Sequence, residues 1–404
     1  MPHVAGQITR YRSFGLFWAS RLLSVVAFNV LAVAIGWQIY ELASDPLDLG
    51  LVGLVQFLPI APLTLIVGQV ADRYDRRLIV ALCRTAQALS SVALAWGTFG
   101  GWLTPGVIFT IVATIGAARA FEDPTMSALL PALVPRRELS RALVWYTTAS
   151  QVARISGPAL GGLLIVLGPA TAYAVGAACY LLAVVLIAVV QVEQQVRVRA
   201  PITLGSVFAG LAFTWRTPVI LGSISLDLFV VLLGGATALL PIYARDILMA
   251  GPEGLGLLRS APAAGALVMS GVLAVFPVRD RVGPLLFGAV IVFGLATVVF
   301  GLSTSMLLSL AALAVLGASN VVSVVIRHSL IQLRTPDPMR GRVSAVHSLF
   351  TGTSNQLGDL ESGLTAALLG TVPSVVIGGS GTVLVALLWM ALFPDIRRAR
   401  SLEG

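Results

Sequence analysis

The chain has 404 residues, of which 57% are hydrophobic and only 11% are charged, and its mean hydropathy is +0.94. Soluble domains carry about 25% charged residues, so this composition excludes an ordinary soluble protein and indicates a membrane protein. The formal net charge is +8, and all 26 basic residues are arginine. Because the chain has no lysine, a P-loop ATPase and pyridoxal chemistry are both excluded.

Apolar segments recur along the whole chain. Each is about 20 residues or longer, which is enough to cross a hydrocarbon core of about 30 Å. They predict an all-α membrane protein with twelve transmembrane helices. The predicted spans cover residues 14–40, 49–71, 78–99, 105–130, 140–167, 169–191, 217–243, 254–277, 284–303, 305–330, 341–369 and 373–393.

Arginine residues are distributed unevenly over the loops between these spans. If successive loops alternate between the two sides of the membrane, one side carries only Arg245 and Arg259. The other side carries Arg10, Arg12, Arg73, Arg76, Arg77, Arg136, Arg137, Arg141, Arg197, Arg199, Arg216, Arg279, Arg281, Arg334, Arg340, Arg342, Arg397, Arg398 and Arg400. By the positive-inside rule the arginine-rich side is cytoplasmic. We therefore expect both termini in the cytoplasm and a multi-pass protein of the cytoplasmic (inner) membrane, whose basic charge reflects topology and lipid contact rather than nucleic acid binding.

The longest polar stretch covers residues 191–201, and six predicted spans lie on each side of it. We expect an N-terminal six-helix half over residues 1–195, a cytoplasmic linker over 196–216 and a C-terminal six-helix half over 217–404. Cys83 and Cys179 both fall inside predicted spans, and the three histidines lack metal-ligand spacing. These patterns predict neither a disulfide nor a metal site.

The loop after the second predicted span carries the most specific motif. Residues 68–77 read GQVADRYDRR, which resembles the loop between helices 2 and 3 of the major facilitator superfamily, with the pattern G-x-x-x-D-R-x-G-R-R. The matching residues are Gly68, Asp72, Arg73, Arg76 and Arg77, and Asp75 stands where the family usually has Gly. The resemblance implies two pseudo-symmetric six-helix halves and transport by alternating access.

The resemblance also implies a gating role for this loop. Asp72 is expected to meet the positive N-terminus of helix 11, and the loop arginines are expected to pair with acids such as Glu122 or Asp123. Such contacts would latch the two halves in the outward-facing state. In the alternative interpretation, the arginines only keep the loop in the cytoplasm.

Two further segments resemble exporters of this superfamily. Residues 157–162 read GPALGG, similar to the antiporter motif core G-P-x-x-G-G, and its matching residues are Gly157, Pro158, Gly161 and Gly162. The motif predicts either a bend in span 5 or ordinary tight helix packing. Residues 333–343 read LRTPDPMRGRV and resemble the P-x-x-x-R-G-R-V loop of the branch that contains enterobactin exporters and drug exporters.

Ionisable residues inside the spans cost several kcal/mol unless they are paired or hydrated, so they are candidates for proton or substrate sites. Asp227 lies ten residues into span 7, or about 15 Å at 1.5 Å per residue. It is expected either to carry the coupled proton or to form a fixed ion pair with an arginine of span 1 or 4. The other charges predicted inside the membrane are Arg21, Arg84, Arg119, Glu122, Asp123, Arg154, Asp359 and Glu361.

Spacing gives some of these residues a predicted neighbour. Arg119, Glu122 and Asp123 follow i, i+3, i+4 spacing, which predicts a shared helix face and a local ion pair. Asp359 and Glu361 are about 200° apart around a helix, so they are not expected to face one pocket together. Arg154 is expected either to pair with an acid or to offer its charge to an anionic substrate.

These observations together predict a secondary active transporter. We expect proton-coupled efflux of a small amphipathic compound, either a drug-like molecule or a siderophore, with an importer of a small nutrient as the alternative. No catalytic cluster or soluble domain indicates an enzyme, and we expect no cofactor. The expected partners are the small-molecule substrate, protons and the lipid bilayer, and the expected state is a monomer.

Overall fold

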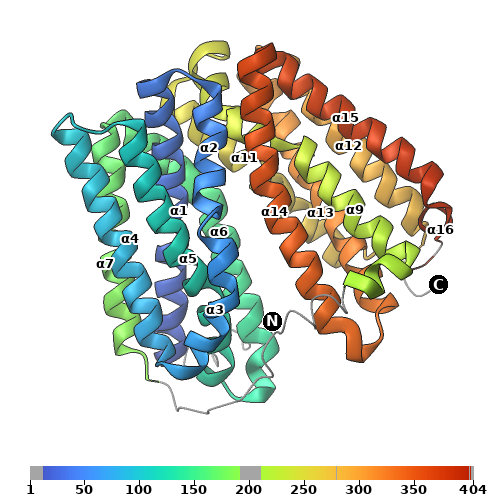
Figure 1. Ribbon diagram of the computed structural model, residues 1–404, viewed down its shortest axis with the longest axis horizontal. Coiled ribbons are helices and arrows are strands. Elements are labelled where there is room, and N and C mark those ends of the chain that lie inside the picture. The colour runs from blue at the N-terminus through green and yellow to red at the C-terminus, as the bar shows by residue number, and fades with distance from the viewer. Residues whose placement is uncertain (1–11, 192–210, 279, 400, 402–404) are drawn as a thin grey trace. The chain divides into compact units, whose positions relative to one another are not determined.

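The computed structural model describes residues 12–191, 211–278, 280–399 and 401, and all regular structure in these ranges is helical (Figure 1). Contacts between Cα atoms divide the chain into two compact units. Unit 1 contains residues 1–43, 55–201 and 255–260, and unit 2 contains residues 44–54, 202–254 and 261–404. The expected linker over 196–216 lies outside the described residues up to residue 210.

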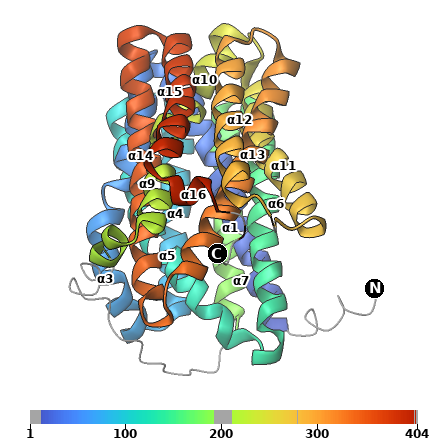
Figure 2. The same cartoon turned by 90° about the vertical axis from the view of Figure 1, so that its right-hand side faces the viewer.

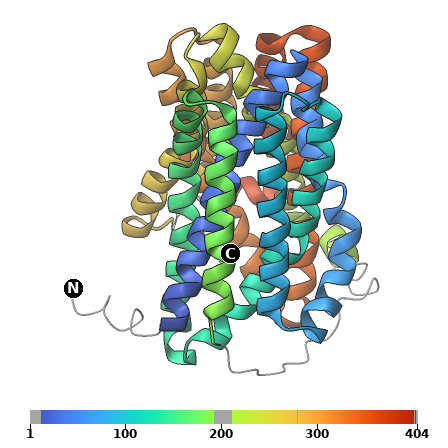
Figure 3. The same cartoon turned by 90° about the vertical axis from the view of Figure 1, so that its left-hand side faces the viewer.

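Unit 1 is built from long helices that lie side by side. Its elements are α1 (Arg12–Ala43), α3 (Ile60–Arg73), α4 (Arg76–Phe99), α5 (Pro105–Leu133), α6 (Leu139–Val166) and α7 (Pro169–Val189), together with the C-terminal end of α2 (Pro46–Phe57). Helix α1 packs against α6 and α7, and α4 packs against α5 and α7. Figure 3 shows α7, in light green, beside both α1 and α4.

Unit 2 is also built from helices, and the segment that follows its first helix is interrupted by short helical turns. Its elements are α9 (Pro218–Leu233), α10 (Leu240–Ile242), most of α11 (Gly251–Val275), α12 (Val282–Leu302), α13 (Met306–Arg334), α14 (Asp337–Leu369), α15 (Thr371–Leu392) and α16 (Pro394–Arg397). Helix α12 packs against α13 and α15 (Figure 2), and α14 packs against α9.

The helices expose large apolar side chains on one side and bury smaller or aromatic ones on the other. On α7, Tyr173, Tyr180 and Ala183 are buried, whereas Leu181 and Val185 are half exposed or more. A surface of leucine and valine is stable in contact with lipid tails and not with water. This distribution therefore agrees with helices that are surrounded by a bilayer.

Ten of the described helical segments are long and apolar enough to cross a membrane. The predicted spans 49–71 and 341–369 do not meet this criterion. The first is divided at Leu58–Pro59 into α2 and α3, because Pro59 has no N–H to continue the helix and disfavours helical geometry in the residue before it. The second is α14, a continuous helix of 33 residues with several charged side chains. Twelve spans therefore stay a prediction.

Span 7 also differs from the single helix predicted over residues 217–243. Helix α9 ends at Leu233, where Gly234 and Gly235 follow, and the chain continues as a 3₁₀ turn (Gly235–Leu239), α10 and a π-helical turn (Tyr243–Ile247). Glycine lowers the stability of a helix interior. A Cβ at Gly235 would lie 2.4 Å from the carbonyl oxygen of Gly358, so the interruption lets α14 approach the backbone of this segment.

Candidate functional site

The arginine-rich loop is fastened to unit 1 by its own residues. Asp75 caps α4 by accepting from the backbone N–H of Arg77 at 2.8 Å, and it also accepts from the Arg77 guanidinium at 2.8 Å. Arg77 donates to the Val190 carbonyl at 2.9 Å, and Arg76 donates to the Ala128 carbonyl at 3.1 Å. The Asp at the family's usual Gly position therefore has a structural role as a helix cap.

These contacts differ from the predicted pairing of this loop for Arg77, which binds Asp75. Glu122 and Asp123 bind arginines of α1, α4 and α5. Arg73 ends α3 and is exposed. The surroundings of Gly68 and the side chain of Asp72 lie outside the described part of the structure, so the latch stays a prediction.

Asp75 gives a prediction on pH and stability. The hydrogen bond from the Arg77 guanidinium lowers the pKa of the Asp75 carboxyl below its ordinary value. Because the folded-state pKa is depressed, the stabilisation is present above the ordinary value of about 4 and is lost as the pH falls through the folded-state pKa. Asp75→Ala should lower the free energy of unfolding by about 1 kcal/mol near neutral pH, as measured by unfolding in detergent micelles.

Asp75→Asn serves as the matched control, because an amide oxygen keeps the cap and loses only the ion pair. It should retain more stability than Asp75→Ala near neutral pH. An Asp75→Ala protein that is as stable as the wild type at pH 7 would show that the cap does not contribute.

The antiporter-like segment brings α6 close to α1. A Cβ at Gly157 would lie 2.6 Å from Cβ of Asn29, and a Cβ at Gly161 would lie 3.1 Å from Cα of Val30. Helix α6 continues through Pro158 as one element. The two helices are therefore tightly packed at these glycines, as one of the two interpretations of the motif predicts. The bend predicted by the other interpretation stays untested.

Gly157→Ala should therefore destabilise the protein by about 1–3 kcal/mol, because the added methyl group overlaps a backbone-proximal atom of α1. Gly15→Ala is the matched control, since no atom lies within 4 Å of the Cβ that it would add to α1. The melting temperature of each variant is measured by thermal unfolding in micelles. Equal melting temperatures for the two variants would show that α6 does not approach α1 this closely.

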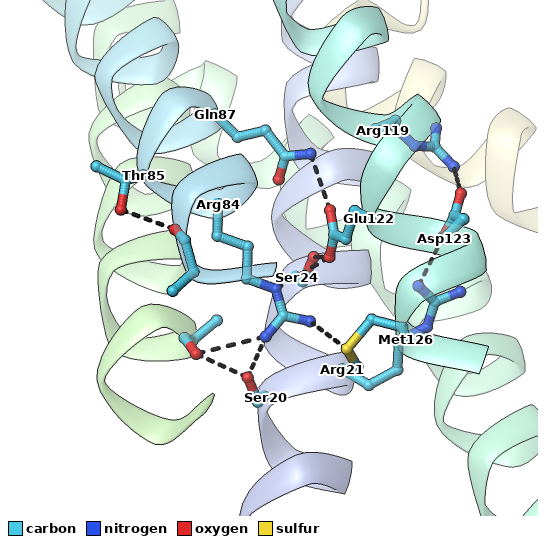
Figure 4. Close-up of polar contacts among 12 residues, drawn as sticks. Ser20, Arg21, Ser24, Arg84, Thr85, Gln87, Arg119, Glu122, Asp123 and Met126 are labelled. Atoms are coloured by element: carbon cyan, nitrogen blue, oxygen red, sulfur yellow. Dashed lines mark hydrogen bonds and ion pairs between the residues drawn. The ribbon is translucent and has the colours of Figure 1, made fainter. Parts of the chain in front are cut away.

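A buried ion pair lies in the middle of unit 1. Arg84 of α4 and Glu122 of α5 are 2.9 Å apart, with side chains that are 0% and 4% exposed. Ser24 and Gln87 donate to the two oxygens of Glu122 at 2.8 and 2.9 Å. The Arg84 guanidinium also contacts Ser20, the Ala183 carbonyl and the sulfur of Met126 (Figure 4). Four helices are held together by this pair.

A second group of charges lies on the other side of α5. Asp123 binds Arg21 of α1 at 2.8 Å and Arg119, one turn earlier on α5, at 3.3 Å. Figure 4 shows Glu122 directed toward Arg84 and Asp123 directed toward Arg21 and Arg119. The predicted local pair of Arg119 with Asp123 is present, but Glu122 belongs to the first group. Arg154 of α6 follows Ser150 by one helical turn, and Ser150 accepts a hydrogen bond from Nε of Arg21 at 3.4 Å.

Asp227 lies in a third group, within unit 2. Its carboxylate is 2.7 Å from the guanidinium of Arg327 on α13, and both side chains are less than 8% exposed. Thr351 of α14 donates to it at 2.8 Å, and Nε2 of His347 lies 3.5 Å away. The ion pair that was one of the two alternatives for Asp227 therefore forms, but its arginine comes from α13 and not from span 1 or 4.

Asp359 and Glu361 face different neighbours, as their spacing predicts. A Cβ at Gly53 of α2 would lie 3.0 Å from a carboxylate oxygen of Asp359. Glu361 accepts a hydrogen bond from Thr365 on its own helix at 2.8 Å. These described contacts of the two acids have no residue in common.

Three residues of the unit 2 group were missed by sequence reasoning. Arg327 lies inside predicted span 10, and its position there is the signal that marks it as an intramembrane charge. His328 and His347 have no metal-ligand spacing along the chain. The structure places their rings at right angles with centroids 5.1 Å apart, a contact between α13 and α14 that no local spacing predicts.

Comparison with known proteins identifies relatives that are membrane transporters. The family model described as transmembrane secretion effector matches residues 8–401. An enterobactin exporter (EntS) of Citrobacter koseri is 27% identical over 399 residues, covering 96% of this chain and 94% of the relative. An EntS of Escherichia coli O1:K1 is 25% identical with the same coverage. These relatives are transporters and not enzymes.

Solved structures share the fold. A bacterial homologue of the human lysosomal transporter Spinster, captured in an inward-facing and occupied conformation, aligns with a TM-score of 0.76 at 14% identity, over 96% of this chain and 99% of that one. A peptide transporter named POT aligns with a TM-score of 0.76 at 11% identity, over 95% of each chain. The match of the family model over nearly the whole length shows that the chain belongs to the transmembrane secretion effector family of the major facilitator superfamily.

Proposed function

We propose that this protein is a proton-coupled exporter of a small amphipathic compound, such as a siderophore or a drug-like molecule. The observation that carries the proposal is the similarity to enterobactin exporters over 96% of the chain. Three groups of charged side chains inside the membrane-spanning helices support it, because such charges are maintained in membranes where they serve transport. Alternating access of two six-helix halves, residues 1–195 and 217–404, is the mechanism we propose.

We propose that the coupled proton is taken up in the Asp227 group. Four side chains from three helices meet there: Asp227 of α9, Arg327 and His328 of α13, and His347 of α14. Helix α15, which also packs against α9 and α14, carries no ionisable residue. An imidazole can both accept and release a proton, so His347, with Nε2 at 3.5 Å from the Asp227 carboxylate, is suited to exchange a proton there. Arg327 offers its positive charge to the same carboxylate at 2.7 Å.

We also propose that both termini and the loops at residues 73–77, 136–141, 197–199 and 334–342 are cytoplasmic. The one-sided arginine distribution supports this orientation. Single cysteines introduced into these loops should resist a membrane-impermeant thiol reagent in intact cells. Rapid labelling of any of them would reverse the orientation.

Transport in membrane vesicles tests the function. In inside-out vesicles an exporter coupled to protons should accumulate substrate against its gradient when the lumen is acidic, and nigericin, which collapses the pH gradient, should release it. Siderophores and cationic, neutral and anionic dyes form the test panel. Accumulation that occurs only in right-side-out vesicles with an acidic exterior would instead support the alternative, import of a nutrient.

A further inference from the structure

We propose that Arg21, Arg119 and Arg154 form a binding site in unit 1 for the anionic group of an aromatic, amphipathic substrate. The inference rests on the proposed transport function and specifies the charge class of the transported compound. It starts from the charges on the helices of this unit.

The helices of unit 1 carry an excess of positive charge near their middle. Helices α4, α6 and α7 contain no Asp or Glu, α1 contains only Glu41 near its C-terminal end, and α5 contains only Glu122 and Asp123. Glu122 is neutralised by Arg84. Arg21 and Arg119 share the carboxylate of Asp123, and Arg154 has no carboxylate partner among the described residues. The described middle portions of these five helices therefore hold two more positive than negative charges around Asp123.

This excess lies at membrane depth. Arg119 is the central residue of the 29-residue helix α5, and Arg154 lies near the centre of the 28-residue helix α6. An uncompensated charge at the centre of a span is costly. An anion that neutralises it would therefore bind with a large electrostatic gain, which is reduced by whatever water reaches the site.

The three arginines are held in different ways. Asp123 fixes Arg21 and Arg119, and Nε of Arg21 also donates to the hydroxyl of Ser150 on α6 at 3.4 Å. Arg154 follows Ser150 by one helical turn, on the same face of α6. In the described part of the chain Arg154 makes neither a hydrogen bond nor an ion pair, so its guanidinium retains all of its donors for a ligand.

Aromatic rings border the same charges. The Arg119 guanidinium lies 3.7 Å from the ring centroid of Phe28, and that of Arg21 lies 5.1 Å from the ring of Tyr146. A guanidinium that stacks on a ring is held in place by its planar face, while the N–H groups at its edge can donate to a carboxylate. The combination of forked donors and rings fits an aromatic acid better than an inorganic anion.

Binding of charge-matched probes to the purified protein in nanodiscs tests this site. The probes are naphthalene-2,3-dicarboxylate, 2-naphthoate and 2-naphthamide, which share one ring system and differ in charge. We expect affinity to fall in that order and the affinity of the dicarboxylate to decrease with added salt. Arg154→Gln should weaken dicarboxylate binding by about tenfold or more, as expected for loss of a charged hydrogen-bond donor, and should leave naphthamide binding unchanged.

Two further variants test whether the effect depends on the charge at position 154. Arg154→Lys retains the charge and should restore part of the dicarboxylate affinity. Arg137→Gln removes the same charge from an exposed turn outside the site and should bind as the wild type does. Thermal unfolding of each variant verifies that it is folded.

The outcomes separate this site from the proposed function. Equal affinity for all three probes, or an Arg154→Gln protein that is folded and binds the dicarboxylate normally, would overturn the anion site even if proton-driven efflux is observed. Charge-selective binding that depends on Arg154 would support the site even if no proton-driven efflux is found.

Discussion

Proton-driven accumulation should be lost in His347→Gln while the protein stays folded. The variant removes the imidazole beside Asp227 but keeps the ion pair of Asp227 with Arg327 at 2.7 Å. The fold should therefore be affected only slightly. Exchange of substrate down its own gradient needs no proton cycle and should continue. Uphill accumulation in inside-out vesicles and downhill exchange, measured on one preparation, separate the two effects.

Asp227→Asn should abolish accumulation as well, but it should also destabilise the protein. It leaves the Arg327 guanidinium, which is 2% exposed, without a counter-ion. Breaking a buried pair from one side costs about 3–5 kcal/mol. A second change, Arg327→Gln, should recover much of that stability without recovering coupling, because the pair is then replaced by two neutral amides.

His328→Gln is the matched control for this group. Its ring contacts that of His347, but within the described part of the chain it makes no hydrogen bond to the carboxylate of Asp227. It should retain uphill transport. If His347→Gln keeps the pH dependence of the wild type, the coupling site lies elsewhere, and Asp359, Glu361, Glu122 and Asp123 are the remaining acids to test.

Glu122→Ala should be among the most destabilising substitutions in the chain. It leaves Arg84, which is 0% exposed, buried beside Ser20 and Met126 with no carboxylate. The expected cost is about 3–5 kcal/mol of unfolding free energy. Arg84→Met combined with Glu122→Leu should be less destabilising than either single removal, because no charge is then left unpaired.

The exposed pair of Arg141 with Glu138 supplies the control. It has a similar separation of 3.2 Å, but the Arg141 side chain is 48% exposed, and exposed pairs contribute only about 0.2–1 kcal/mol. Unfolding of Glu138→Ala and Glu122→Ala in the same micelles should differ severalfold in free energy. Equal losses would show that burial does not govern the strength of the Arg84 pair.

The sequence predicted the ion pair of Arg119 with Asp123 because that pair is local. The two residues lie one helical turn apart on one helix, so their spacing alone brings the side chains together. The predicted partner of Asp227 was wrong for the opposite reason. Several helices carry an arginine that could pair with a buried acid, and the sequence does not show which of these helices lies beside it.

By itself, the sequence determined that this chain is a helical membrane protein of the major facilitator type, because lipid solvation imposes apolar segments of a fixed length and a recognisable loop between them. Only the tertiary structure decided which charges meet. Arg21 and Asp123 are 102 residues apart, and Asp227 and Thr351 are 124 apart. Their contacts depend on how each helix is rotated about its axis and packed against its neighbours, and this is a property of the assembled bundle. Glu122 and Asp123 are adjacent in sequence, yet Glu122 lies in a buried ion pair with Arg84, whereas Asp123 is 43% exposed and binds Arg21 and Arg119.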